Sequence, residues 1–362
     1  MNSIINNYLI AGFLKTIFNV VLVFICLGVI LNLFEEIEFF KKFNLGLGLP
    51  ILLTIMYIPN LIIKLLPFII FISAMWYLIS IKSNKDLLTL KVFGFSNLKI
   101  IFMLALTAFL FGAIIIVAVT PVTSLMVKFY EQTKSKYSRD IDHLFSVNKN
   151  GLWIKEVNDN VLRITSAKST NGNYINDITV YEINKIDNKL LRRIESEQAD
   201  ISQNQWVFKK ATIYMLNEEN EVRFEENFKL SSIYNVDRLN TFYRNLDTIS
   251  FVQLINEYDL LIDRGYNKEV LNEQINIFFS LPVFLFLMVV LASIFSMGNI
   301  NKSQNFYYVF ISIITCVIIY YFKDLSIAMG QTNRISLMMS VWMPIIAIGL
   351  FCTIGILQIN EK

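Results

Sequence analysis

The sequence is poor in the side chains that usually build catalytic and metal sites. It contains one histidine and three cysteines in 362 residues. Cys26, Cys316 and Cys352 all fall inside apolar stretches, so neither a disulfide framework nor a CxxC pair is available. His143 lies in a polar stretch without a partner nearby in the sequence, and we interpret it as a solvated loop residue. We therefore expect no metal and no cofactor.

Nucleotide-binding and hydrolase motifs are missing as well. The sequence has no GxxxxGK[ST] run, no HExxH and no GxSxG. We therefore predict that the chain is not an enzyme. Any ATP that its function requires must be bound by another chain.

Charged side chains are scarce. They make up 17% of the sequence against 55% hydrophobic residues, and the mean hydropathy is +0.52. A soluble protein of this composition would lack the polar surface to cover its core, whereas a bilayer needs no such cover. The net charge of +3 does not indicate a nucleic-acid partner. The apolar excess lies in the two flanks, whereas residues 149–273 have the composition of a soluble domain.

Six apolar stretches are long enough to cross about 30 Å of hydrocarbon at roughly 1.5 Å per residue. The first has only Lys15 as an early charge and no small-residue cleavage site before Glu35, so we expect a retained helix instead of a signal peptide. Residues 45–60, interrupted by two glycines and two prolines, are expected to lie at the membrane interface. The predicted spans are 10–34, 61–81, 98–121, 275–297, 307–322 and 337–357.

Lysines orient the predicted spans. Lys82, Lys85 and Lys91 lie between spans two and three with a single acid, and Lys99 lies at the start of span three. Lys302 lies between spans four and five, so these loops are expected to be cytoplasmic. Both ends of the chain then face the cytoplasm, and the acidic cluster at Glu35, Glu36 and Glu38 faces the other side. The long insert between spans three and four is external. In a bacterium this describes a multi-pass inner-membrane protein with a periplasmic domain.

The insert is predicted to be a β domain. Short runs rich in β-branched and aromatic residues alternate with turn residues, which predicts a single β-sandwich or β-jellyroll. Apolar residues at helical spacing from Ser250 to Arg264, followed by Gly265 as a C-cap, predict a short connecting helix. The expected strands are 152–155, 161–164, 177–183, 190–195, 206–208, 211–216, 222–224 and 228–230. The expected divisions are 1–132 and 273–362 for the two transmembrane halves, 133–249 for the β domain and 250–272 for the connecting helix.

The cytoplasmic loop between spans two and three predicts a short surface helix at about 83–95. Ser83 is a candidate N-cap and Gly94 ends the run. Two interpretations are open for this helix: a lysine-rich anchor on anionic lipid, or a helix that docks into a cytoplasmic ATPase, with Asp86 paired to a basic residue of that partner. The residues at helical spacing are Leu87, Leu88, Lys91 and Val92.

Basic residues beside the external ends of the spans form a second set. Lys64 lies just inside the outer end of span two, where snorkelling to the interface is the simplest explanation. Lys41 and Lys42 follow span one and Lys128 follows span three, where they can meet anionic head groups or phosphates. Singly, each is an ordinary surface lysine. Their collection at one depth favours an acidic substrate.

The three-plus-three layout, the external β insert and the cytoplasmic Asp86 helix together resemble the LptF/LptG permease family, which extracts lipopolysaccharide from the bacterial inner membrane. The resemblance covers nearly the whole chain. The segment Gly151-Leu-Trp153-Ile-Lys155 is similar to the LptG branch in particular. The other matching pieces are Pro67, the run from Asp86 through Gly94 to Ser96, Pro121, Leu281-Pro282 and Tyr321-Phe-Lys-Asp324.

The resemblance implies a permease subunit of an ATP-driven ABC transporter, with no bond chemistry of its own. Two such permeases, one LptF-like, pair at lateral gates between span one of each and span five of the other. An LptB-like ATPase dimer binds on the cytoplasmic side, and a periplasmic bridge of LptC-like and LptA-like proteins carries the lipid toward the outer membrane. The sequence departs from the family at Asp86, where glutamate is commoner, and at Asn32 and Asn60, where we would expect basic residues.

The resemblance also implies roles for individual residues. Lysines at the rim would hold the phosphates of lipopolysaccharide, and apolar residues of span two would line a cavity for its acyl chains. ATP-driven closure would push the coupling helices together and collapse that cavity. The expected substrate contacts are Lys41, Lys42, Lys64, Lys128, Leu66, Phe68, Ile69 and Phe71. The expected ATPase contacts are Asp86, Leu87, Lys91, Phe93 and Gly94.

Three alternatives remain beside this interpretation. The chain could be the sibling permease LptF, or a membrane-anchored adaptor whose β domain recruits periplasmic partners without transport. The third, a secondary transporter, usually places acidic ion ligands at mid-membrane. It is disfavoured because no aspartate or glutamate lies within the predicted spans.

Overall fold

The computed structural model describes most of the chain and divides into two compact units. The first unit comprises Met1–Tyr130, Ile249–Val252 and Asn272–Lys362, and the second comprises Glu131–Thr248 and Gln253–Leu271. The described residues are 2–43, 46–135, 137, 144–148, 151–158, 161–171, 173–185, 189–215, 221–232, 234, 246–263, 266, 268–297, 305–332 and 334–360. His143 and Gly265, singled out above, lie outside them.

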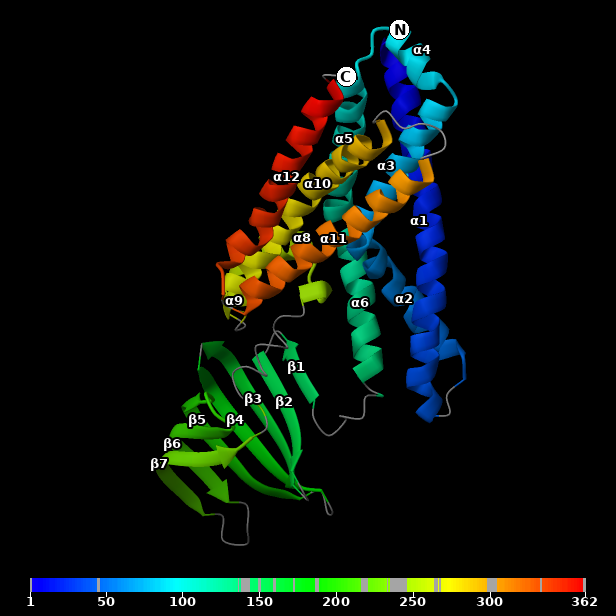
Figure 1. Ribbon diagram of the computed structural model, residues 1–362. Helices are drawn as coiled ribbons and strands as arrows, with labels where there is room; N and C mark the ends of the chain where they lie inside the picture. The colour runs from blue at the N-terminus through cyan, green and yellow to red at the C-terminus, as the bar shows by residue number, and fades with distance from the viewer. Residues whose placement is uncertain are drawn as a thin grey trace. The chain divides into compact units, whose positions relative to one another are not determined.

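The first unit contains six helices that are long and apolar enough to cross a membrane, which confirms the predicted number and their three-plus-three distribution around the insert. The beginning of α1 and the end of α12 lie at the same end of this unit as α4 (Figure 1). Its helices are α1 (Asn2–Phe40), α2 (Gly48–Lys64), α3 (Leu66–Ser83), α4 (Asp86–Val92), α5 (Asn97–Ile114), α6 (Thr120–Ser135), α10 (Lys268–Met297), α11 (Asn305–Gln331) and α12 (Leu337–Asn360), with a short 3-10 turn η1 (Lys41–Phe43) after α1.

Several helices run well past the predicted spans. The 39 residues of α1 extend roughly 58 Å at 1.5 Å per residue, about twice the thickness of the hydrocarbon layer. The fifth span is Val309–Gln331, so it includes Lys323 and Asp324, and the first span includes Glu36. The predicted spans contain no acidic residue, but the helices extend beyond them to include these acids, because hydropathy detects only their most apolar stretch.

The predicted second span is two helices. Leu65 separates α2 from α3, and Pro67 lies in the first turn of α3. Proline has no backbone N–H and its ring crowds the preceding turn, so it fits a first turn without the cost that it brings to the interior of a helix. α2 packs along α1, where Gly28 allows close approach: a Cβ atom there would lie 3.3 Å from Ile58 and Leu61.

The third span was predicted to end at Pro121. This is wrong, because the helix continues through that residue. A π-helical segment η2 (Ile115–Val119) follows α5, and Pro121 then occupies the first turn of α6. The wider turn relieves the clash between the proline ring and the carbonyl one turn earlier. Thr120 and Ser124 bond their side chains to carbonyls of the same helix. The result is one nearly continuous helix from residue 97 to residue 135.

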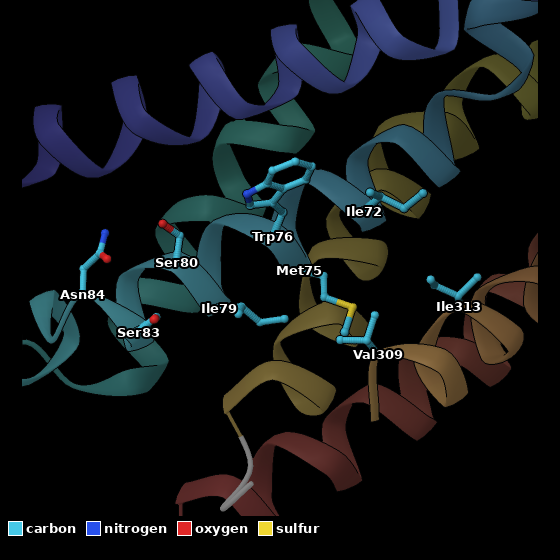
Figure 2. A pocket seen from close by; sticks show the side chains of 9 residues that line it. All are labelled: Ile72, Met75, Trp76, Ile79, Ser80, Ser83, Asn84, Val309 and Ile313. Carbon is cyan, nitrogen blue, oxygen red and sulfur yellow. The ribbon is translucent and has the colours of Figure 1, made fainter. Parts of the chain in front are cut away.

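A groove opens between α3 and α11 on the surface of the first unit. It has a volume of about 470 Å³ and is lined by side chains of both helices. Figure 2 shows these side chains, with polar residues gathered at one end. Its walls lie within the second and fifth spans.

The second unit holds the inserted β sheet, which confirms the predicted all-β insert. Its seven strands pair antiparallel with their neighbours in chain order. Where a sandwich or jellyroll was expected, the described strands form a single meandering sheet. The predicted strands 206–208 and 211–216 are one strand, and so are 222–224 and 228–230. The strands are β1 (Leu144–Asn148), β2 (Gly151–Asn158), β3 (Val161–Asn171), β4 (Tyr174–Asn184), β5 (Leu190–Asp200), β6 (Gln205–Met215) and β7 (Val222–Ser231).

One face of the sheet carries the hydrophobic core of this unit, with Ile154, Val180, Ile194 and Phe208 fully buried. After β7 the chain passes back over this face, where the carbonyl of Tyr234 accepts a hydrogen bond from the Trp206 indole at 2.6 Å. Tyr234 is therefore part of the core on this face of the sheet.

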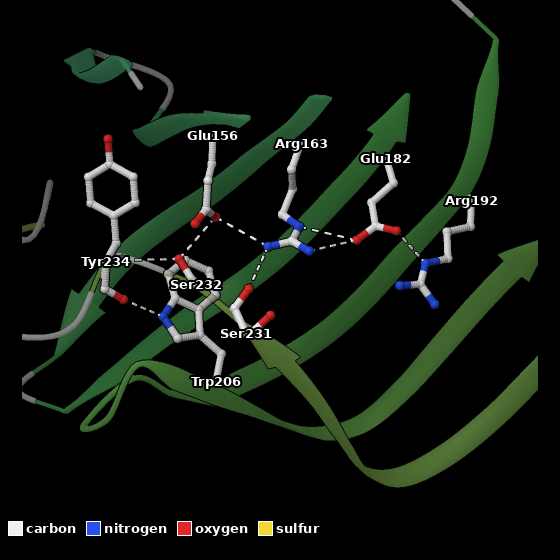
Figure 3. A network of polar contacts seen from close by, with 8 residues as sticks. All are labelled: Glu156, Arg163, Glu182, Arg192, Trp206, Ser231, Ser232 and Tyr234. Atoms are coloured by element: carbon white, nitrogen blue, oxygen red, sulfur yellow. Dashed lines mark hydrogen bonds and ion pairs between the residues drawn. The ribbon is translucent and has the colours of Figure 1, made fainter. Parts of the chain in front are cut away.

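A row of alternating charges crosses the same face. Glu156, Arg163, Glu182 and Arg192 are directly paired on β2, β3, β4 and β5. Arg163 lies 3.2 Å from Glu156 and 3.0 Å from Glu182, and Arg192 lies 2.6 Å from Glu182 (Figure 3). Arg163 also donates to the carbonyl of Ser231 at 2.6 Å. This charge ladder connects the first strands of the sheet to the end of the last.

The predicted connecting helix is present as two short helices, α8 (Phe251–Asn256) and α9 (Tyr258–Asp263), preceded by a 3-10 turn η3 (Leu246–Thr248). Phe251 stacks edge-on against Phe278 and Phe279 of α10, with ring centroids 5.5 Å apart in both pairs. These contacts lie within the first unit.

Candidate functional site

The predicted surface helix exists as α4, and its start differs from the prediction. Ser83 does not cap it, because Ser83 is the last residue of α3. The helix begins at Asp86, after Lys85 in a left-handed conformation with φ of 64°. The N–H groups of Asn84 and Lys85 bond to the carbonyls of Ser80 and Lys82 at 3.0 and 3.3 Å. The turn from α3 to α4 is thus closed by backbone hydrogen bonds.

The Gly-x-Ser segment after α4 has a structural explanation. Gly94 is left-handed with φ of 81°, and its N–H bonds to Lys91, while the N–H of Phe95 bonds to Leu90 at 3.0 Å. This is a Schellman motif, which requires the φ that glycine adopts most readily. Ser96 then caps α5 by accepting a hydrogen bond from the N–H of Lys99 at 3.2 Å. Gly94 therefore ends the helix as predicted.

α4 presents a buried face and an exposed face. Leu90 and Phe95 belong to the hydrophobic core of the helix bundle, and Leu87 packs partly against it. On the other side, Leu88 is 62% exposed and Val92 is 84% exposed. An apolar group held outward on a fixed surface helix is typical of a protein docking site.

The remaining predicted coupling residues surround this surface. Phe93 is 51% exposed, and Lys91 and Gly94 are exposed as well. Asp86 is half-buried and accepts a hydrogen bond from the Tyr8 hydroxyl of α1 at 3.3 Å. One end of α4 is thus connected to the first span. We define the coupling surface as Leu88, Lys91, Val92, Phe93 and Gly94.

Two of the predicted rim lysines lie at one end of the bundle. Lys41 is exposed in η1 and Lys128 is exposed on α6. The Tyr130 hydroxyl donates to the buried Glu36 carboxylate at 2.7 Å, which connects α6 to the end of α1 close to both lysines. Lys42 also lies in η1, but its side chain is outside the described part.

Lys64 is not at that end. It is the last residue of α2, whose 17 residues extend roughly 25 Å from the η1 end. Its backbone carbonyl accepts a hydrogen bond from the Tyr320 hydroxyl of α11 at 3.5 Å, and its side chain is exposed. Lys64 therefore lies at a different level along the helix bundle from Lys41 and Lys128.

The four apolar residues predicted to line a cavity differ in accessibility. Leu66, Ile69 and Phe71 are buried within the helix bundle of this chain. Phe68 is only partly buried, and its ring stacks on Tyr320 with centroids 4.5 Å apart. In this conformation only Phe68 of the four is open to a lipid chain.

The burial of several polar residues of the spans was not predicted from the sequence. Lys323 is buried on α11, with its ammonium group 4.6 Å from the centre of the Phe284 ring. Asn32 and Asn60, where basic residues were expected, are buried on the packed helices α1 and α2. A charge at either position would be taken out of water inside a helix pair, which is costly. The only sign of this burial in the sequence was the position of each polar residue within or beside an apolar run.

Among the described residues, no group of three histidine, cysteine, aspartate or glutamate side chains could hold a metal ion. The arrangement instead combines long spanning helices, a fixed surface helix with an exposed apolar face, a basic outer end and an inserted β sheet. It defines a multi-pass membrane protein with an inserted β domain.

Comparison with known proteins identifies the family. The sequence pattern described as "Lipopolysaccharide export system permease LptF/LptG" matches residues 7–358. The chain therefore belongs to the LptF/LptG family of lipopolysaccharide export permeases, and the predicted class of function is confirmed. A search of curated proteins returns no match.

Proposed function

We propose that this permease is one of two that together form the membrane part of an ATP-driven transporter. Its partners are an LptF-like permease and an LptB-like ATPase dimer that docks on α4. The observation that carries the proposal is the coupling surface, where Val92 and Leu88 project from a helix fixed by buried Leu90 and Phe95. Lys91 is the only cation among the five residues of this surface, and Lys85 and Lys99 lie outside it; an apolar face with one charge suits a protein groove.

Within the family, an LptG-like role is proposed from the segment Gly151-Leu-Trp153-Ile-Lys155, which begins β2. Trp153 is partly exposed on this strand. The LptF-like role remains the alternative within the same transporter.

Orientation follows from the lysines that surround α4. Lys82, Lys85, Lys91 and Lys99 all lie at that end of the bundle, which supports a cytoplasmic location for α4. The η1 end and the inserted β sheet are then periplasmic, and the membrane is the bacterial inner membrane.

The rim at the η1 end supports a substrate contact. Lipopolysaccharide carries phosphates, and Lys41, Lys42 and Lys128 provide cations for them. Acyl chains would lie against Phe68, whereas Leu66, Ile69 and Phe71 would support the wall from behind in this conformation. Lys64, deeper along α2, would contact the lipid after it enters.

The sheet offers a route to the periplasmic bridge of LptC-like and LptA-like proteins. β1 and β7 are the edges of the described sheet. Exposed edges pair readily with strands of another chain. Disulfide crosslinks between cysteines placed on either edge and on the bridge protein would identify the paired strand.

The coupling proposal is tested by Asp86→Lys. A reversed charge at the start of α4 is expected to prevent assembly with the ATPase and to abolish lipopolysaccharide export. The substitution also removes the hydrogen bond from Tyr8, so Tyr8→Phe, which removes that bond but keeps the carboxylate, is the matched control. If Asp86→Lys copurifies with the ATPase and supports export, Asp86 does not couple the permease to the ATPase.

The rim proposal is tested by Lys41→Glu combined with Lys128→Glu. The double variant is expected to reduce photo-crosslinking of the permease to lipopolysaccharide severalfold, because two attractive contacts to phosphate become repulsive. The control is Lys168→Glu with Lys229→Glu, the same charge change at exposed lysines of the sheet. Equal crosslinking in both double variants would rule out the rim assignment.

A further inference from the structure

The groove between α3 and α11 has the shape and chemistry of a lipid-chain site. Its volume of about 470 Å³ lies within the range of roughly 300–1,000 Å³ typical of small-molecule pockets. Ile72 and Ile79 of α3 and Val309 and Ile313 of α11 line it. These side chains converge from the two helices around Met75 (Figure 2).

The two helices are held together at Met75, within the groove, and again beyond its apolar end. The Ser312 hydroxyl of α11 donates to the Met75 sulfur of α3 at 2.9 Å, and further along, Phe68 stacks on Tyr320. On the α4 side of Met75, the groove is lined by the small residues Ser80 and Ser83 as well as by Ile79. Small side chains leave space between helices that larger ones would fill.

One end of the groove is polar and adjoins a cation. Ser80, Ser83 and Asn84 line the end nearest α4, and Lys85 is the exposed residue that follows. Trp76, which is 65% exposed, borders the apolar part. An apolar slot with hydroxyl and amide groups at its end, followed in the chain by the exposed Lys85, is complementary to an anionic amphiphile whose head lies at the turn between α3 and α4.

We propose that this groove binds one acyl chain of an anionic glycerophospholipid from the leaflet on the α4 side, with its phosphate at the Ser83–Lys85 turn. The site is separate from the proposed substrate rim, because the head group lies at the end of the bundle opposite Lys41 and Lys128. The leaflet assignment rests on the orientation given under the proposed function. A bound lipid would contact the turn that begins α4, so occupancy would stabilise the coupling surface.

The test uses the full chain in nanodiscs of phosphatidylethanolamine with phosphatidylglycerol as the minor component. A photoreactive residue replaces Ile79 in the groove or, as the matched control, Leu110, which is 54% exposed on α5 and outside the groove. Mass spectrometry of the adducts gives the ratio of the two lipids at each position. We expect phosphatidylglycerol to be enriched severalfold at position 79 and to match the bulk ratio at position 110.

A charge variant then tests the head-group site. Lys85→Asn removes the cation and suits the left-handed backbone at this position. It is expected to return the adduct ratio at position 79 to the bulk value while leaving the adduct yield unchanged. The proposal is overturned by a bulk ratio at position 79 in the wild-type chain, by enrichment that survives Lys85→Asn, or by adducts that form with added lipopolysaccharide in preference to phospholipid. The readout needs no ATPase, so it is independent of whether the transporter assembles as proposed.

Discussion

Replacing Leu88 and Val92 with aspartate is expected to separate the permease from its ATPase without unfolding it. Both side chains are largely exposed, so the folded chain loses little when they change. If the ATPase buries them, each contributes about 1.5–3 kcal/mol to binding. The double variant should therefore weaken binding at least about 100-fold, since every 1.4 kcal/mol is roughly tenfold. Binding of the ATPase to the nanodisc-reconstituted permease pair measures the effect.

A matched control comes from the inserted sheet. Val222 and Phe224 of β7 are exposed apolar residues, 49% and 79% accessible, and the same two aspartate substitutions there should leave ATPase binding unchanged. Equal loss in both variants would point to general destabilisation. Unchanged binding in the α4 variant would remove the coupling surface from the ATPase interface.

The second large effect is expected at Arg163. Arg163→Met leaves Glu156 and Glu182 facing each other across β3, both buried and without the guanidinium between them. Removing one partner of a buried ion pair typically costs about 3–5 kcal/mol. Hydrogen exchange of peptides from β3 and β4, measured in the detergent-solubilised full chain, gives the local free energy of opening.

The control for Arg163 is Arg223→Met. Arg223 pairs with Glu221 on the surface of the sheet, with both side chains about half exposed. An exposed pair contributes about 0–1 kcal/mol, so this variant should exchange almost like the wild type. If the two variants behave alike, the charge ladder does not stabilise the sheet.

The ladder also predicts a pH dependence. Burial of Glu182 would raise its pKa, but hydrogen bonds and charges from Arg192 and Arg163 outweigh burial and hold that pKa below its usual value. The stability contributed by this carboxylate is thus fully present above about pH 4.3, the value for an unfolded chain, and is lost as the pH falls through the lower folded value. In Arg163→Met one cation is lost, so acidification should cost that variant less stability than it costs the wild type.

The membrane part could be predicted because hydrophobicity is a local property of the sequence. Each of the six spans is detectable in its own apolar run, yet the true ends of α1 and α6 lie beyond those runs. A hydropathy profile falls where polar residues begin, but the helix continues as long as its backbone hydrogen bonds and packing contacts are maintained. The break at Leu65 was missed because the apolar run passes through it unchanged.

In the candidate site, too, the features that depend on local sequence were predicted and those that depend on tertiary structure were not. α4 and its end at Gly94 follow from local spacing and glycine chemistry, and both were predicted. The separation of Lys64 from Lys41 was not, because it depends on α2 being a helix of its own. The charge ladder was invisible in the sequence, since its members become neighbours only through the register of four strands.

The joints of α4 determine how it can transmit movement. On one side a hydrogen-bonded turn at Lys85 connects it to α3, and on the other Gly94 and Ser96 lead directly into α5. Both connections are short and hydrogen-bonded, and the buried side chains of Leu90 and Phe95 hold α4 against the helix bundle. We therefore expect a force on the exposed face of α4 to move α3 and α5 together as a rigid body. Most of the displacement should then reach the helix bundle.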